Sequence, residues 1–323
     1  MKRAGWKLLL ATAITLTTGM ASAQQVLKFG HSYETTEAIH QETVKAAEQI
    51  AKRTEGRYDV QVFPSSQLGN NNDMDKGLTL GTVDIVLSNN AFAATAYPPI
   101  GITQFPYIFR DADHLLAYAK SDTYKKLNAA YTEKTGHQIV ATSYFGSRHT
   151  ISTKLIKTCE ELKGLKFRVV PIPAYVAVAR ACEANPTPIT YAEVYLALQN
   201  GTVDLAENPL TAMEAMKFFE VAKFIALTGH IVDSNNTVIS KSAWAKIAEA
   251  DRTIFVEELQ AAADRVSEAV KQREGELVSF FKDQGLTITE VDRAAFEKAA
   301  VERVSLSEFG YSQEDYDAIK AIQ

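Results

Sequence analysis

The sequence is poor in the residues that build metal sites and membrane anchors. Its 323 residues include only two cysteines and six histidines. Neither the cysteines, Cys159 and Cys182, nor the histidines have the close spacing that zinc sites use, so we expect no metal site. After residue 23, no stretch approaches the roughly 18 consecutive apolar residues of a membrane-spanning helix.

Catalytic signatures are also missing. The chain has no GXSXG, HEXXH or GXGXXG motif and no phosphate-binding GXXXXGK[ST] loop. Ser147 and His149 are near neighbours in "GSRHTIS", but no third member of a triad is evident. The formal net charge is −5 and basic runs are absent, which disfavours nucleic-acid binding. We therefore expect neither an enzyme nor a cofactor, and no nucleic-acid partner.

The first 23 residues have the composition of a secretory signal. "MKRAGWKLLLATAITLTTGMASA" begins with basic residues, continues with an apolar stretch and ends with small residues, which predicts cleavage near Ala23. A membrane anchor is the alternative, but the apolar stretch is too short to span a bilayer. Cleavage leaves 300 residues with a formal net charge of −8, because three basic and no acidic side chains are removed.

Export to an oxidising compartment raises the question of a disulfide. Cys159 and Cys182 are the only candidates for the bond. They form either one disulfide or two separate buried thiols, because sequence spacing does not show whether their Cα atoms lie within bonding range.

The pattern along the chain predicts an α/β fold in two halves. A strand over 26–32 is followed by a helix over 37–53 and a strand over 58–64. The same order of elements returns after residue 138, so we expect a mostly parallel sheet in each half. A helix predicted over 251–284 is about 50 Å long, enough to lie across both halves.

Polar residues stand at the ends of several predicted strands, where ligands of open α/β sheets bind. Arg168 lies in the apolar run "GLKFRVVP", where a charge needs a partner or a wet cleft. Arg148 in "GSRHT" and Asn208 in "LAENP" also follow strand-like runs. Two interpretations stay open: structural ion pairs and a helix cap, or a site where guanidinium groups bind a carboxylate.

Several longer motifs carry a family resemblance. They are "FPSSQLG", "GTVDIVLSN", "GSRHTIST", "LKGLKFRVV", "ANPTPITYAEVYLALQNGTVDLAENPL" and "FFEVAKFIALTGH". Together they resemble the periplasmic solute-binding proteins of tripartite ATP-independent periplasmic (TRAP) transporters. The resemblance implies a two-lobed periplasmic binding protein fold, with a long helix spanning both lobes. It implies lobe I over 24–145 plus 234–273, and lobe II over 146–233 plus 274–323 with the C-terminal helices.

The resemblance also implies a function. The family captures an organic acid in the periplasm and delivers it to the small and large membrane subunits of a permease. Arg168 matches the arginine that pairs with the ligand carboxylate, Arg148 matches a second contact, and Asn208 matches an asparagine that hydrogen-bonds the same group. Glu207 and His230 match positions near the hinge, where they steady the arginine or have ordinary structural roles. We expect a monomer.

Within this family, the sequence motifs are most similar to those of the sialic-acid-binding members, in which the position of Tyr191 carries a ring that stacks on the ligand. Other pocket positions differ, because Asn89 and Phe92 stand where those proteins have a glutamate and an arginine. Ser32 replaces an asparagine and Asn71 an aspartate, and His31 is a further candidate for ligand binding. We therefore do not expect sialic acid as the ligand. A sugar acid, an aldonate or uronate, is favoured over a four-carbon, keto or aromatic acid.

Further aromatic residues are candidates for the pocket wall, namely Tyr144, Phe145 and Tyr175. Two other functions stay open. A sensory binding subunit would present the same closed form to a membrane receptor. A periplasmic isomerase or lyase would use the same cleft to act on a carboxylate.

Overall fold

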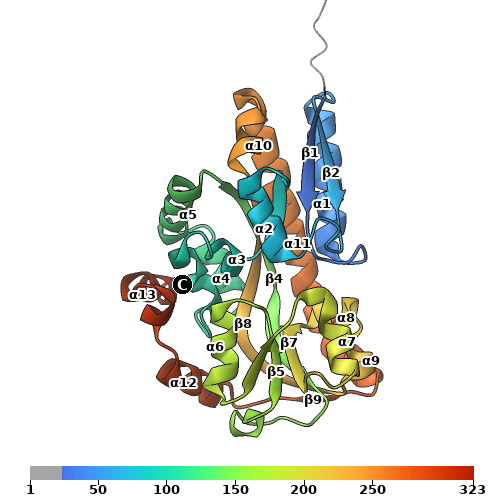
Figure 1. The fold of residues 1–323 in the computed structure, drawn as a ribbon, viewed down its shortest axis with the longest axis vertical. Coiled ribbons are helices and arrows are strands. Elements are labelled where there is room, and N and C mark those ends of the chain that lie inside the picture. The colour runs from blue at the N-terminus through green and yellow to red at the C-terminus, as the bar shows by residue number, and fades with distance from the viewer. Residues whose placement is uncertain (1–23) are drawn as a thin grey trace, which may run out of the picture.

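The computed structural model describes residues 24–323, so the predicted signal segment 1–23 and its cleavage site near Ala23 lie outside the described residues. One nine-stranded sheet runs through two lobes, with helices on its faces (Figure 1). The strands are β1 Gln25–Gly30, β2 Tyr58–Phe63, β3 Ile85–Ser88, β4 Gln138–Ser152, β5 Lys166–Val169, β6 Asn185–Pro188, β7 Leu205–Pro209, β8 Phe224–Ile239 and β9 Thr287–Thr289.

The sheet is parallel within each lobe and antiparallel where the lobes join. The strand order is β2-β1-β3-β8-β4-β7-β5-β6, and β9 pairs with β8. In lobe I, β1 pairs in parallel with β2 and β3; in lobe II, β5 pairs in parallel with β6 and β7. The pairs β3–β8, β8–β4 and β4–β7 are antiparallel. The expected parallel halves are present, joined by the two long strands β4 and β8.

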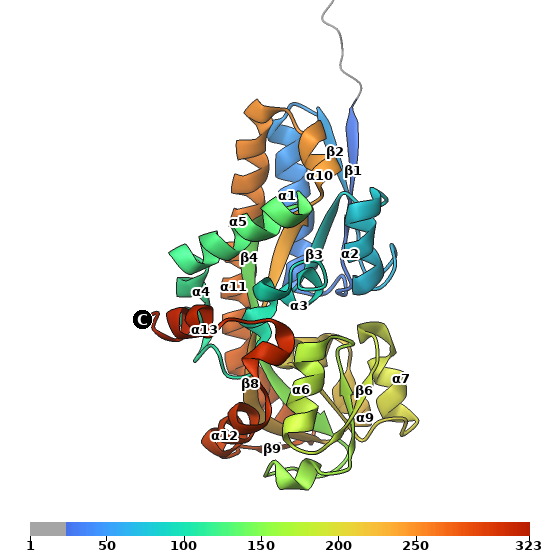
Figure 2. The same ribbon diagram turned by 60° about the vertical axis from the view of Figure 1, so that its left-hand side comes forward.

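Helices cover both lobes (Figure 2). Those of lobe I are α1 Ala38–Arg53, α2 Asn71–Leu80, α3 Asn90–Ala93, α4 Ala112–Tyr118, α5 Asp122–Thr135 and α10 Lys241–Lys246. Those of lobe II are α6 Pro173–Ala181, α7 Val194–Gln199, α8 Leu210–Ala215, α9 Phe218–Val221 and α12 Arg293–Arg303. The 35-residue helix α11 (Glu249–Asp283) packs on α1 in lobe I and on α8 in lobe II, so it spans both lobes as predicted.

The strand β4 bends where it passes from one lobe to the other. Its register against β8 shifts between Tyr144 and Gly146, and Gly146 has a φ of 125°, in the region that favours glycine. A Cβ at Gly146 would lie 2.7 Å from Pro209 Cβ, so a larger residue would not fit. Glu274 of α11 accepts a hydrogen bond from the Ser147 amide at 2.7 Å, which ties the spanning helix to this bend.

A disulfide and the packing of the last helix connect segments at the outside of the molecule. Cys159 and Cys182 form a disulfide in lobe II, which joins the segment before β5 to the end of α6. The last helix, α13 (Gln313–Lys320), packs against α5 of lobe I, where Lys126 Nζ lies 2.9 Å from Asp315 Oδ1. None of the helices between residues 24 and 323 has an apolar run sufficient to span a bilayer.

Candidate functional site

A cavity lies between the lobes, at the carboxyl ends of the parallel strands. Its empty volume is about 730 Å³, including the part that is open to solvent. Lobe I contributes the residues that follow β1, β2 and β3, and lobe II contributes those at or after the ends of β5, β6 and β7. Phe145 and Arg148 of β4 and Asp233 of β8 complete the lining. Polar groups from both lobes therefore face one space, as the strand-end argument predicts.

Arg168 is buried in lobe II but has few partners. Its side chain is 1% exposed and lines the cavity. Nε donates to the Ile189 carbonyl at 2.9 Å, and Nη1 donates to Asn208 Oδ1 at 3.2 Å. Its nearest carboxylate oxygen, Glu207 Oε1, is 4.0 Å away, and Nη2 makes no hydrogen bond within residues 24–323. Burial, with the charge of Arg148 beside it, lowers the pKa of Arg168 to about 10.

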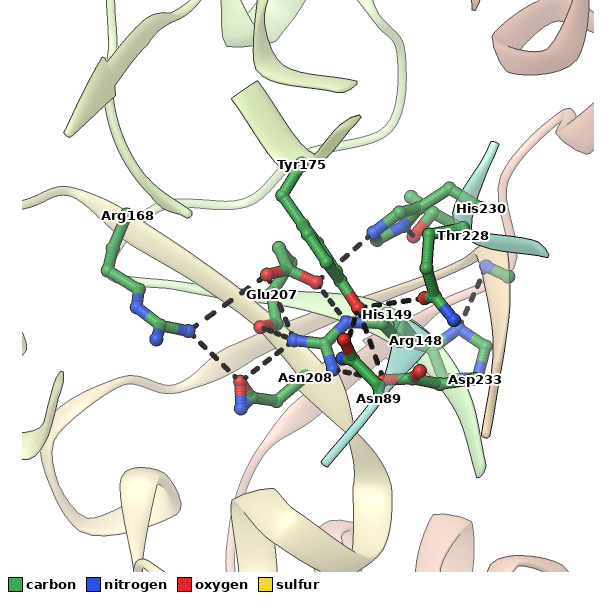
Figure 3. A network of polar contacts seen from close by, with 12 residues as sticks. Asn89, Arg148, His149, Arg168, Tyr175, Glu207, Asn208, Thr228, His230 and Asp233 are labelled. Atoms are coloured by element: carbon green, nitrogen blue, oxygen red, sulfur yellow. Dashed lines mark hydrogen bonds and ion pairs between the residues drawn. The ribbon is translucent and has the colours of Figure 1, made fainter. Parts of the chain in front are cut away.

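Arg148, in contrast, is held by the protein's own acids (Figure 3). Its Nε and Nη2 donate to the Glu207 carboxylate, and its Nη1 donates to Asp233 Oδ2 at 2.6 Å. The guanidinium lies 4.9 Å from the centre of the Tyr175 ring. Burial alone would lower the pKa of Arg148, but the two carboxylates raise it above its ordinary value. Its charge is therefore compensated inside the protein.

Glu207 and His230 extend this network away from the cavity. Glu207 is fully buried, and although burial favours its neutral form, the charge of Arg148 lowers its pKa to about 2. His230 Nε2 lies 3.5 Å from Glu207 Oε2. Burial lowers the pKa of His230, so its ring is neutral near pH 7. Glu207 therefore holds Arg148 in place, and His230 lies beside Glu207; that the pair steadies an arginine for ligand binding stays a prediction.

Asn208 connects the two arginines. Its Oδ1 accepts from Arg168 Nη1 at 3.2 Å and from Arg148 Nη2 at 3.3 Å. The residue lies within β7, opposite His149 of β4, and it is not a helix cap. Because its oxygen faces two donors, its Nδ2 is left as a hydrogen-bond donor for a ligand.

Asn89 lines the cavity and also links the lobes. Its Oδ1 accepts from the Ala91 amide and thereby caps α3, while its Nδ2 donates to the Tyr175 hydroxyl at 2.9 Å. The same hydroxyl donates to Gln104 Oε1 at 2.9 Å. Tyr175 is thus a bridge between α6 and lobe I and does not line the cavity, in contrast to its prediction as pocket wall.

The other predicted residues divide into two groups. Ser32, Asn71, Phe92 and Tyr191 line the cavity, and so does Phe145. The Tyr191 ring makes edge contacts with Tyr33 and Phe218.

His31 and Tyr144 do not line the cavity. His31 is fully buried, accepts from the Tyr33 amide and contacts His40, and burial lowers its pKa to about 3. The Tyr144 hydroxyl donates to Glu274 on α11.

Sequence reasoning missed several lining residues, notably Tyr33, Ser66 and Asp233. Tyr33 donates to Asn235 Oδ1 at 2.6 Å, and its ring lies 4.8 Å from that of Phe145. Asp233 lies in the middle of β8, in a stretch whose polar residues do not predict a strand. The position of Tyr33, directly after Ser32 and three residues after the end of β1, is the one signal that pointed toward it.

The match to a protein family covers most of the chain. Residues 29–307 match the model of bacterial extracellular solute-binding protein, family 7. The chain belongs to this family. It is a solute receptor of the TRAP transporter class, whose members bind small acids and work with membrane permease subunits.

Relatives and solved structures agree with this assignment. The chain is 33% identical to the sialic acid-binding periplasmic protein of Vibrio cholerae, over 91% of both chains. It is 30% identical to the 2,3-diketo-L-gulonate-binding periplasmic protein of Escherichia coli, over 91% of this chain and 90% of that protein. A TRAP solute-binding protein of Roseobacter denitrificans with bound L-galactonate superposes with a TM-score of 0.86 at 30% identity, covering 93% of this chain and 99% of that one.

Proposed function

We propose that this receptor captures a sugar acid, an aldonate or a uronate, between its lobes and delivers it unchanged to the small and large membrane subunits of a TRAP permease. The observation that carries the proposal is Arg168, a buried cation in the cavity wall to which residues 24–323 offer no carboxylate within hydrogen-bonding distance. An incoming carboxylate would supply the missing partner, and the planar guanidinium suits its geometry.

The carboxylate would bind Arg168 through the uncommitted Nη2 and accept a further hydrogen bond from Asn208 Nδ2. Arg148 also lines the cavity, but its three nitrogens already donate to protein oxygens. We therefore assign Arg148 a supporting role, in which it fixes Asn208 and adds positive potential. This differs from the direct contact that the resemblance implied for Arg148.

Structures of related proteins support an acid of this class. The Roseobacter denitrificans protein binds L-galactonate, and a Polaromonas protein that is 29% identical, with a TM-score of 0.87, binds D-erythronate. A Fusobacterium protein that is 28% identical binds sn-glycerol-3-phosphate, so the fold also admits phosphate esters. The ligand of this chain must therefore be argued from its own residues.

We also propose that the mature chain begins at Gln24, is located in the periplasm and acts as a monomer. The lobe division at 24–145 plus 234–273 and 146–233 plus 274–323 stays a proposal with one revision. Because α13 packs on α5, the residues from 313 onward belong with lobe I.

The proposal is tested by calorimetric titration of the mature protein, residues 24–323, with a panel of aldonates, uronates, dicarboxylates, keto acids and aromatic acids. Saturable binding of an aldonate or uronate, with unchanged ligand recovered by mass spectrometry, is the expected result. Binding of neutral sugars alone would contradict the role of Arg168. Chemical conversion of the bound acid would indicate an enzyme.

A further inference from the structure

The part of the cavity that lobe I contributes is polar but contains no cation. Its lining includes Ser32, Ser66, Asn71 and Asn89, all neutral side chains that donate or accept hydrogen bonds. Among all the residues that line the cavity, Arg148 and Arg168 are the only basic ones, and both come from the lobe II side of the β4 bend. A ligand that extends from Arg168 toward lobe I therefore meets amides, hydroxyls and the rings of Tyr33 and Phe92, and no cation.

Three of the lining residues carry buried polar atoms without a partner. They are Ser32 Oγ, Asn71 Oδ1 and Tyr191 Oη, for which the described residues provide no hydrogen bond. Ser32 is only 5% exposed, so its hydroxyl is nearly removed from solvent. Buried polar atoms are normally hydrogen-bonded, and atoms like these mark the places where a ligand supplies the missing group. Neutral oxygen and amide groups match alcohol hydroxyls, which both donate and accept.

One of the lining cations is free to pair with a negative charge on the ligand. Arg148 is engaged by Glu207 and Asp233, which leaves Arg168 as the one lining cation without a close carboxylate. A single carboxylate matches that charge. A second anionic group on the same ligand would have no cation as a partner. Removing such an unpaired charge from water is unfavourable.

Carboxylates lie close to the lobe I side of the cavity, where their negative charge would repel a second anionic group of the ligand. Asp73, in the first turn of α2, accepts from Asn70 Nδ2 at 2.6 Å, and Asn70 lines the cavity. Glu34 accepts from Ser65 at 3.2 Å, next to the lining residue Ser66. The N-terminal end of α2 adds partial positive charge, but Asp73 offsets it.

We propose that the site selects a singly charged, polyhydroxylated acid and rejects acids with a second anionic group, such as aldarates, short dicarboxylates and phosphate esters. The carboxylate binds at Arg168, and hydroxyl groups along the carbon chain bind Ser32, Asn71 and Tyr191. This inference rests on the proposed function, because it assumes that a carboxylate occupies Arg168.

The first test compares a monoacid with ligands that carry one additional anionic group. The monoacid that binds most tightly among D-gluconate, L-galactonate and D-erythronate is titrated into residues 24–323, followed by its aldarate and its terminal phosphate ester. The expected result is affinity about 100-fold or more lower for both ligands that carry the second anionic group. Equal or tighter binding of a dianion would overturn the inference and leave the proposed function standing. Failure of every carboxylic acid to bind would overturn both.

The second test changes the protein. Asn71→Lys places a cation beside the cavity and is expected to raise the affinity for a dianion relative to the monoacid by about tenfold. Leu80→Lys is the matched control, because it adds the same charge to the far, exposed end of α2, where Leu80 is 76% exposed. Equal changes in the two variants would show that net charge, and not the cavity, controls selection.

The third test addresses the hydroxyl contacts. Ser32→Ala is expected to weaken the polyhydroxylated monoacid by about tenfold while changing the affinity for one of its deoxy analogues little. Unfolding temperatures of the free proteins show that the variant is folded. An equal loss for the parent acid and for every deoxy analogue would contradict the assignment of Ser32. Tighter binding of an unhydroxylated keto or aromatic acid would overturn the polyhydroxylated class itself.

Discussion

Replacing each of the two buried arginines separately distinguishes a ligand-binding charge from a structural one. Arg168→Lys keeps the charge of Arg168 but removes the planar fork, and Arg168→Met removes the charge. Arg148→Met is the matched comparison, because both arginines line the same cavity and are at most 4% exposed. Their partners differ, since Arg148 binds two carboxylates and Arg168 binds an amide oxygen and a carbonyl.

The expected magnitudes follow from these partners. Arg148→Met leaves Glu207 and Asp233 buried without their cation, which costs about 3–5 kcal/mol of unfolding free energy. For about 300 residues the unfolding entropy is about 0.6 kcal/mol/K, so the midpoint of thermal unfolding should fall by about 5–8 °C. Arg168 has no such carboxylate, so Arg168→Met should change the unfolding temperature of the free protein little.

Ligand binding should respond the opposite way to these changes. Arg168→Lys removes the guanidinium Nη2 that is proposed to bind the carboxylate, and a loss of about 3–5 kcal/mol weakens binding by 10²- to 10³-fold or more. Calorimetric titration and thermal unfolding of the three variants, each with and without ligand, provide the measurement. An unchanged dissociation constant for Arg168→Lys, or a large loss of stability of the free protein in Arg168→Met, would refute the reasoning.

Three further predictions follow from the same contacts. Tyr175→Phe keeps the ring over Arg148 but loses the hydroxyl that Asn89 binds, so titration should show affinity about tenfold weaker, with the ligand contacts unchanged. Burial lowers the pKa of His149 to about 3, so its contribution to stability is present above about pH 6.5 and is lost as the pH falls. At pH 5 the loss is about 2 kcal/mol, and His149→Asn should flatten the fall in unfolding temperature. The disulfide closes a loop with a sequence separation of 23, so reducing it should cost about 3 kcal/mol in denaturant unfolding.

Each of these three has an outcome that contradicts it. Wild-type affinity in Tyr175→Phe would show that the bridge between the lobes does not affect closure. An unfolding temperature that is flat between pH 7 and 5 would contradict the neutral state of His149. Two titratable thiols in the denatured, unreduced protein would exclude the disulfide.

The local spacing of apolar residues was enough to predict the helices and strands that bury one face. The helices α1 and α11 have apolar residues at helical spacing, and the predicted strands have strand-like runs. The structure has these elements within a few residues of the predicted bounds. The strand β8 escaped prediction because its Ser234, Asn235 and Asn236 are polar residues that are all buried. A strand covered on both sides has no apolar–polar alternation. Its polar residues are stabilised by tertiary contacts, such as the bond from Tyr33 to Asn235.

In the candidate site, too, contacts between residues that are distant in the sequence could not be predicted. That Arg168 and Arg148 belong near a ligand could be predicted from their places at strand ends and from the family resemblance. Which of them is already neutralised could not, because the partners of Arg148 lie 59 and 85 residues away in the chain. Spacing between such distant residues carries no information on pairing. For the same reason, Tyr175 was predicted as pocket wall although it bridges the lobes through Asn89 and Gln104.

The most direct test of the central claim is a crystal structure of residues 24–323 with the acid that binds most tightly. The account predicts that the ligand carboxylate lies within hydrogen-bonding distance of Arg168 Nη2 and Asn208 Nδ2, with Arg148 still bound to Glu207 and Asp233. A structure in which Arg168 binds a carboxylate of the protein itself, with the ligand's acid group elsewhere, would contradict it.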